Sequence, residues 1–249
     1  MASTSSLATT WTRHPALYID DGNIVLLAET TLFKVHRSFL TRGSAVFHDM
    51  FAMPAPPGSA QDGDSDEQPV VLHQVRAQDF ERLLRILYPP EIGRTALRTA
   101  DEWASVYELA RRFQFESLTE VALETLAKMP LPPVERIRIS RTYEILPDWI
   151  HVGAIQLVIR FEPLSIDEVN TLGTDIAVCL FHAREHYRAK EYAPCVHTCS
   201  VCDCDDVRMF CESCQEYTEL PSSSSSANGQ LGHAIEALEG AGFPPSSAT

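Results

Sequence analysis

The chain has 249 residues, of which 45% are hydrophobic, so it can bury the core of one large domain or two smaller ones. Its formal net charge of −14 argues against a nucleic-acid binder, because phosphate contacts need clustered lysine and arginine. No stretch approaches the roughly 20 apolar residues of a membrane helix, and the N-terminus lacks the basic and apolar regions of a secretory signal. We therefore expect an intracellular protein, in the cytoplasm or the nucleus.

The N-terminal half begins with a predicted small sheet. Residues 1–14 are polar, and we expect them to be disordered. NIVLLA (23–28) and TLFKVH (31–36) are apolar runs separated by a two-residue turn, so they predict a β-hairpin. Two short helical segments follow, with Gly43 as the stop of the first and Ser44 as the N-cap of the second.

A loop, a strand and three helices complete this half. Residues 54–69 carry prolines, glycines and four acids, which is typical of a loop, and 69–73 predict a short strand. Apolar residues three or four positions apart then predict three amphipathic helices. These residues are Phe80, Leu83, Leu84 and Leu87; Trp103, Val106, Tyr107 and Ala110; and Leu118, Val121, Ala122, Leu126 and Met129. The predicted order is ββααβααα, ending near residue 130.

The chain beyond residue 130 is predicted to be a helical extension over residues 131–194. Its helices are expected near 133–144, near 148–160, and from Thr174 to about Tyr192. SIDE (165–168) predicts a capping box, because Ser165 can accept a bond from the Glu168 N–H while the Glu168 side chain reaches back. Residues 219–249 include LPSSSSSANGQ, a low-complexity run, and predict a flexible tail, in which HAIEALEGAGF (233–243) could form a fragment of helix that is too short to stand alone.

Three stretches of the N-terminal half resemble one known domain. NIVLLAETTLFKVHRSFLTRGSAVFHDMF, QDFERLLRILYP and VYELARRFQFESLTEVALETL, in this order, resemble the BTB/POZ domain of fungal BTB proteins over about residues 15–130. The region that follows resembles the helical extension of many fungal members. The resemblance implies an α+β fold, with a small sheet capped by helices. It also implies a role in dimerisation or partner docking, with no catalytic machinery.

Individual positions carry the resemblance further. His36 and Arg37 match the His-Lys/Arg pair that follows the second strand of the family. Asn23 stands where many members have an aspartate, which forms a charged pocket at the dimer interface, so the chain departs from that mode of pairing. Phe47, Met50 and Phe51 match the aromatic-x-x-Met-Phe helix of the family. Members that recruit cullin ubiquitin ligases often carry an apolar-x-Glu sequence after this helix. Here the sequence is Met53-Pro54-Ala55, which weakens the prediction of a cullin.

The phenylalanine- and methionine-rich region before residue 54 supplies the predicted docking residues. An exposed apolar patch often marks a partner surface, although the same residues could form ordinary core. The residues predicted to dock are Phe47, Met50, Phe51 and Met53. We predict no catalytic residue, since no Walker loop, G-x-S-x-G or H-E-x-x-H motif is present. His36 is expected to bond the backbone across the turn rather than to act as a base.

Cysteines are concentrated in residues 195–218. Six of the seven lie between Cys195 and Cys214, and two C-x2-C pairs predict a structural, tetrahedral zinc site. The predicted ligands are Cys199, Cys202, Cys211 and Cys214, and Cys195, His197 and Cys204 are spare candidates. A redox pair is disfavoured because its βαβ context is absent, and a disordered cysteine-rich tail without metal is the other alternative.

The sequence thus predicts a non-enzymatic adaptor that acts through a BTB-like surface. Its partners are expected to be proteins, including a second copy of the chain, and not nucleic acid or a membrane. Two alternatives stay open, a substrate receptor of a cullin ubiquitin ligase and a transcriptional regulator. The eight acids and one arginine from Cys195 to the C-terminus oppose DNA binding by the cysteine element.

Overall fold

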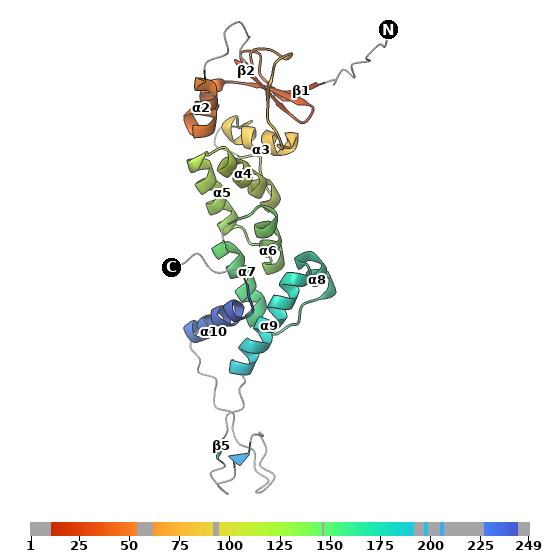
Figure 1. Ribbon diagram of the computed structural model, residues 1–249, viewed down its shortest axis with the longest axis vertical. Coiled ribbons are helices and arrows are strands. Elements are labelled where there is room, and N and C mark those ends of the chain that lie inside the picture. The colour runs from red at the N-terminus through yellow and green to blue at the C-terminus, as the bar shows by residue number, and fades with distance from the viewer. Residues whose placement is uncertain are drawn as a thin grey trace. The chain divides into compact units, whose positions relative to one another are not determined.

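A computed structural model describes residues 11–53, 62–91, 95–145, 147–191, 197–198, 205–206 and 227–243. The chain divides into two compact units, Met1–Pro130 and Leu131–Thr249. The division lies in the proline-rich stretch around residue 130. Figure 1 shows a sheet with helices in the first unit and helices in the second.

The first unit is built on a four-stranded sheet with the strand order β1-β3-β2-β4. Its strands are β1 (Thr12–Tyr18), β2 (Ile24–Ala28), β3 (Thr31–Val35) and β4 (Val70–Val71). The predicted hairpin is confirmed, because β2 and β3 pair in antiparallel fashion with Leu26 opposite Phe33. The turn places Glu29 at a φ of 52°. β1 lies parallel to β3, and β4 lies parallel to β2.

Strand β1 corrects the prediction that residues 1–14 are disordered, because the strand begins at Thr12. The His14 ring is buried and stacks on Phe33, with 5.0 Å between the ring centroids. Its Nδ1 accepts the Leu17 N–H at 2.9 Å. Tyr18 packs on a cluster that contains Val25. The strand is therefore held by partners on β2 and β3, which its own polar sequence does not indicate.

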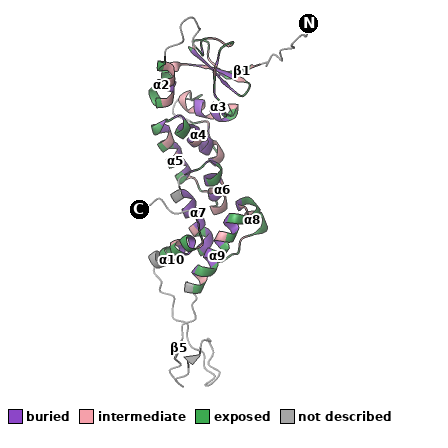
Figure 2. Ribbon diagram, viewed as in Figure 1, coloured by how far each residue is buried: buried purple, intermediate pink, exposed green. Residues whose placement is uncertain are grey.

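Five helices of the first unit are described, and each lies where a helix was predicted. They are α1 (Arg37–Gly43), α2 (Ala45–Ala52), α3 (Ala77–Leu87), α4 (Ala100–Arg112) and α5 (Glu116–Lys128). The Ser44 side chain accepts the Phe47 N–H, so Ser44 is the predicted N-cap of α2. Phe80 meets Phe33 edge-on at 5.2 Å, which joins α3 to the sheet. Figure 2 shows that these helices carry both buried and exposed residues.

The second unit is helical in its described residues, apart from two short strands. Its helices are α6 (Pro133–Thr142), α7 (Pro147–Ile159), α8 (Ile166–Leu172), α9 (Thr174–Glu191) and α10 (Ala227–Gly240). The capping box of Ser165 and Glu168 is present at the start of α8. Gly173, with φ at 82°, separates α8 from α9.

Helix α10 lies within 219–249, where a flexible tail was predicted. The prediction is wrong for the described residues of this segment, because Ala234, Ala237, Leu238 and Phe243 are buried in the core of the second unit. The Phe243 ring lies 5.6 Å from that of His151 on α7, between centroids. A helix this short gains its stability from tertiary packing, which local sequence does not display.

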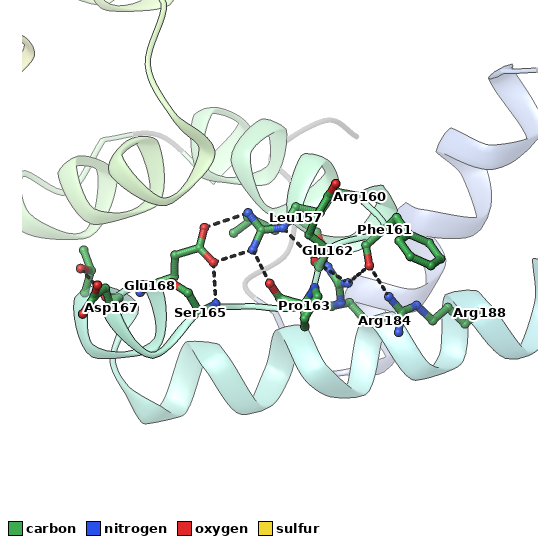
Figure 3. A network of polar contacts seen from close by, with 11 residues as sticks. Leu157, Arg160, Phe161, Glu162, Pro163, Ser165, Asp167, Glu168, Arg184 and Arg188 are labelled. Atoms are coloured by element: carbon green, nitrogen blue, oxygen red, sulfur yellow. Dashed lines mark hydrogen bonds and ion pairs between the residues drawn. The ribbon is translucent and has the colours of Figure 1, made fainter.

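The connection between α7 and α8 is held by arginines, as Figure 3 shows. Buried Arg184 of α9 donates to the carbonyl oxygens of Leu157, Phe161 and Glu162. The last carbonyls of a helix have no intrahelical donor, so Arg184 satisfies groups that α7 leaves open. Arg160 forms a bidentate pair with Glu168, with a shortest distance of 2.5 Å.

Candidate protein-interaction surface

His36 lies at the junction of β3 and α1 and binds two side chains. Its backbone N–H donates to the Tyr88 hydroxyl at 2.9 Å, and its Nδ1 lies 3.1 Å from the same oxygen. Its Nε2 lies 3.4 Å from a carboxylate oxygen of Asp21. Because the hydroxyl already accepts the backbone N–H, its own proton is free for Nδ1, which leaves Nε2–H facing Asp21.

These contacts give His36 a structural role. The ring bonds Tyr88, just after α3, rather than the backbone that was predicted as its partner. Burial raises the pKa of the Tyr88 hydroxyl, so that group stays protonated and is a poor nucleophile. The arrangement fixes the β3–α1 junction against the end of α3.

Asn23 also serves the junction. Its Oδ1 accepts the Arg37 N–H at 2.7 Å, which satisfies one of the open N–H groups in the first turn of α1. The family's aspartate could accept the same bond. The position therefore has a local role that asparagine fulfils without adding charge.

Helices α1 and α2 present apolar side chains next to cations, and we call these residues the α1–α2 surface. They are Arg37, Phe39, Arg42, Met50, Phe51 and Met53. The Arg37 guanidinium lies 4.9 Å from the Phe51 ring centroid, and that of Arg42 lies 5.7 Å from the Phe39 centroid. Met53 is 64% exposed and Phe39 is 37% exposed. Met50 and Phe51 are half-buried.

Phe47 does not belong to this surface, although it was predicted to dock. Its side chain is completely buried and packs on Phe113 at 4.8 Å between ring centroids. It faces inward because Ser44, three residues earlier, fixes the first turn of α2 against the Phe113 carbonyl. Phe47 is a core residue; of the other predicted docking residues, Met53 is exposed and Met50 and Phe51 are half-buried.

Positive charge accompanies the exposed apolar groups. Arg37 has one distant ion-pair partner, Asp64, at 4.0 Å. Arg42 has no ion pair within the part of the chain that the structure describes. The surface thus offers apolar contact and guanidinium groups on a chain whose net charge is −14.

Comparison with known families decides the nature of the first unit. The family model of the BTB/POZ domain matches residues 20–129. Residues 20–129 are a BTB/POZ domain. Such domains mediate protein–protein contacts, and many of them dimerise. No curated protein matches the chain closely enough to count as a relative.

A second exposed apolar group lies outside the BTB/POZ domain. Phe161, in the α7–α8 connection (Figure 3), is 83% exposed, and Ile166, the first residue of α8, is 81% exposed. The Phe161 carbonyl accepts bonds from Arg184 and from Arg188, the latter at 3.0 Å. The connection therefore holds an exposed ring on a fixed backbone. Sequence reasoning missed these residues, since an apolar residue at a helix end carries no sign of its exposure.

The predicted zinc ligands Cys199, Cys202, Cys211 and Cys214 lie outside the described residues. Near them, His197–Thr198 (β5) and Asp205–Asp206 (β6) form an antiparallel pair. Within the described ranges, no three His, Cys, Asp or Glu side chains are grouped to hold a metal ion. The zinc site stays a prediction. No described helix is both long and apolar enough to cross a membrane.

Proposed function

We propose that this protein is a non-enzymatic adaptor that binds a protein partner, or a second copy of itself, through the α1–α2 surface of its BTB/POZ domain. The observation that carries the proposal is the exposure of Met53, together with the Arg37–Phe51 and Arg42–Phe39 pairs on the same two helices. Aromatic residues, methionine and arginine are enriched at the centres of protein interfaces. A contiguous exposed apolar patch often marks a protein–protein interaction site.

The polar groups near this surface support a binding role over a reaction. His36 contacts the Tyr88 hydroxyl through Nδ1 and lies 3.4 Å from Asp21 through Nε2, so both of its ring nitrogens have partners within the domain.

A hollow of about 260 Å³ in the second unit is lined by Arg138, Arg141 and Thr171, among others. Arg138 binds Glu135, and Arg141 binds Asp175 and the Leu172 carbonyl. Both arginines of the hollow are therefore bound to groups of the second unit itself.

Light scattering of the purified chain tests the proposed surface. We expect a dimer for the native chain and a monomer for the double variant Met53→Asp, Phe51→Asp, because two carboxylates would be desolvated on association. The matched control is Val121→Asp, since Val121 is 48% exposed on α5 of the same domain. The control is expected to keep the native mass.

Two outcomes contradict this proposal. An unchanged dimer in the double variant would place association elsewhere. The second outcome is a monomeric native chain whose protein partners bind the double variant as tightly as they bind the native chain. It would show that the α1–α2 surface takes no part in binding. A cullin among those partners would identify the alternative role as a ligase receptor.

We also propose that the helical extension presents a second surface and that the cysteine element binds structural zinc. The rigid, exposed Phe161 supports the first part, and the two C-x2-C pairs support the second. Metal analysis of the full chain tests the zinc site. About one zinc per chain, lost when Cys199 and Cys214 are both changed to serine, is the expected result.

A further inference from the structure

Helix α9 carries two histidines on its exposed face. His182 and His186 are both exposed, and they are four residues apart in one helix. Leu180, Ala183 and Tyr187 of the same helix are buried in the core of the second unit. The core therefore fixes the backbone of α9 and directs the two imidazoles to solvent.

Neither imidazole has a partner within the described part of the chain. His14 bonds the Leu17 N–H, His36 bonds Tyr88, and His48 contacts Asp49. His182 and His186 have no hydrogen bond, ion pair or ring contact among the described residues. As far as the described residues go, their ring nitrogens are open to a ligand.

We infer that His182 and His186 form a chelating site for a divalent transition-metal ion. Residues four apart in a helix lie on the same face, about 6 Å apart along the axis, so both imidazoles can reach one ion. Two histidines at this spacing bind zinc in helical metal motifs. Imidazole nitrogen is a ligand that zinc, nickel, copper and cobalt accept.

Glu185 adds to the site by its charge. It lies between the two histidines in H-x-x-E-H order and is also exposed. Its carboxylate adds negative charge near the pair, but no three His, Cys, Asp or Glu side chains are grouped around one metal position in the described residues, so the two imidazoles are the protein ligands. Two imidazoles leave further coordination positions to water. The site needs neither the cysteine segment nor the α1–α2 surface, so it is independent of the proposed function.

The test uses Co²⁺ on the full chain, because thiolate ligands give cobalt a charge-transfer band that imidazole ligands lack. Nitrogen ligation is followed by the paramagnetic broadening of the His182 and His186 imidazole signals in NMR. We expect His182→Gln and His186→Gln each to weaken the binding of Co²⁺ by at least about tenfold. The loss of a residue that only hydrogen-bonds a metal ligand already lowers metal affinity by about that factor. The control His73→Gln changes another exposed histidine and is expected to leave the affinity unchanged.

Acidification provides a second readout. Protons compete with the metal for the imidazole nitrogens, so the affinity for Co²⁺ is expected to fall when the solution is acidified. Circular dichroism should show the same helix content in all three variants, because the changed side chains are exposed. The inference is overturned if both α9 variants bind Co²⁺ like the native chain, or if cobalt reaches only thiolate ligands.

Discussion

A single residue, Ser44, fixes the start of α2, one of the two helices that carry the α1–α2 surface. Ser44 Oγ accepts the Phe47 N–H at 3.0 Å and donates to the Phe113 carbonyl at 2.5 Å. The hydroxyl is buried, so water cannot replace either bond without rearrangement. One side chain thereby caps α2 and joins it to the end of α4.

Replacing this hydroxyl should destabilise the BTB/POZ domain. We expect Ser44→Ala to lower the free energy of unfolding by about 2 kcal/mol, because a cap is lost and a buried carbonyl loses its donor. Urea denaturation of the full chain measures the change. Ser38→Ala, at an exposed serine of α1, is the control and should stay within about 0.5 kcal/mol of the native chain. Equal effects of the two changes would contradict the role of Ser44.

At the scale of elements, helix ends were predicted well, strand β1 was missed, and α10 was predicted only as a possible helical fragment within a flexible tail. The caps at Ser44 and Ser165 are recognisable because the bonding groups lie within three residues of each other. Strand β1 depends on His14 stacking against Phe33, and α10 depends on a core formed by α7 and α9. Partners so distant in sequence leave no local pattern. The burial of Phe47 was missed for the same reason, since its neighbour Phe113 is remote.

The α7–α8 connection should make stability depend on pH. Hydrogen bonding to Arg160 lowers the pKa of Glu168 from its ordinary 4.5 to about 2. Since the folded pKa is depressed, the ionised carboxylate stabilises the fold above about pH 4.5. That contribution is lost as the pH falls toward 2.

We expect Glu168→Gln to be less stable than the native chain at pH 7, with the difference shrinking between pH 4.5 and 2. Urea denaturation at a series of pH values measures it. Asp167→Asn is the neighbouring control, because Asp167 is exposed and its side chain has no ion pair among the described residues. A constant difference between Glu168→Gln and the native chain at every pH would contradict the assignment.

At the scale of the whole molecule, the chain has two compact units with a core in each. The second core includes Leu157, Leu180, Leu238 and Phe243, all from Leu131–Thr249. The BTB/POZ domain has its own buried residues, among them Phe33 and Phe80. A defect in one core should therefore stay within its unit.

Phe243→Ala tests this separation. The cavity should cost the second unit about 3 to 5 kcal/mol and leave the BTB/POZ domain unaffected. Hydrogen exchange followed by mass spectrometry separates the two regions. Faster exchange in α7, α9 and α10, with unchanged exchange in α3 and α4, is the expected result. Equal acceleration in both units would show that they unfold as one.

Helix α10 has a consequence for the cysteine segment. Because α10 returns to pack on α9 and α7, the residues between Glu191 and Ala227 are tethered at both ends to one folded body. Closing such a loop depends only weakly on its length, and each doubling costs about 0.6 kcal/mol. Inserted sequence there would thus cost little stability, and the two flanking helices would keep their mutual packing.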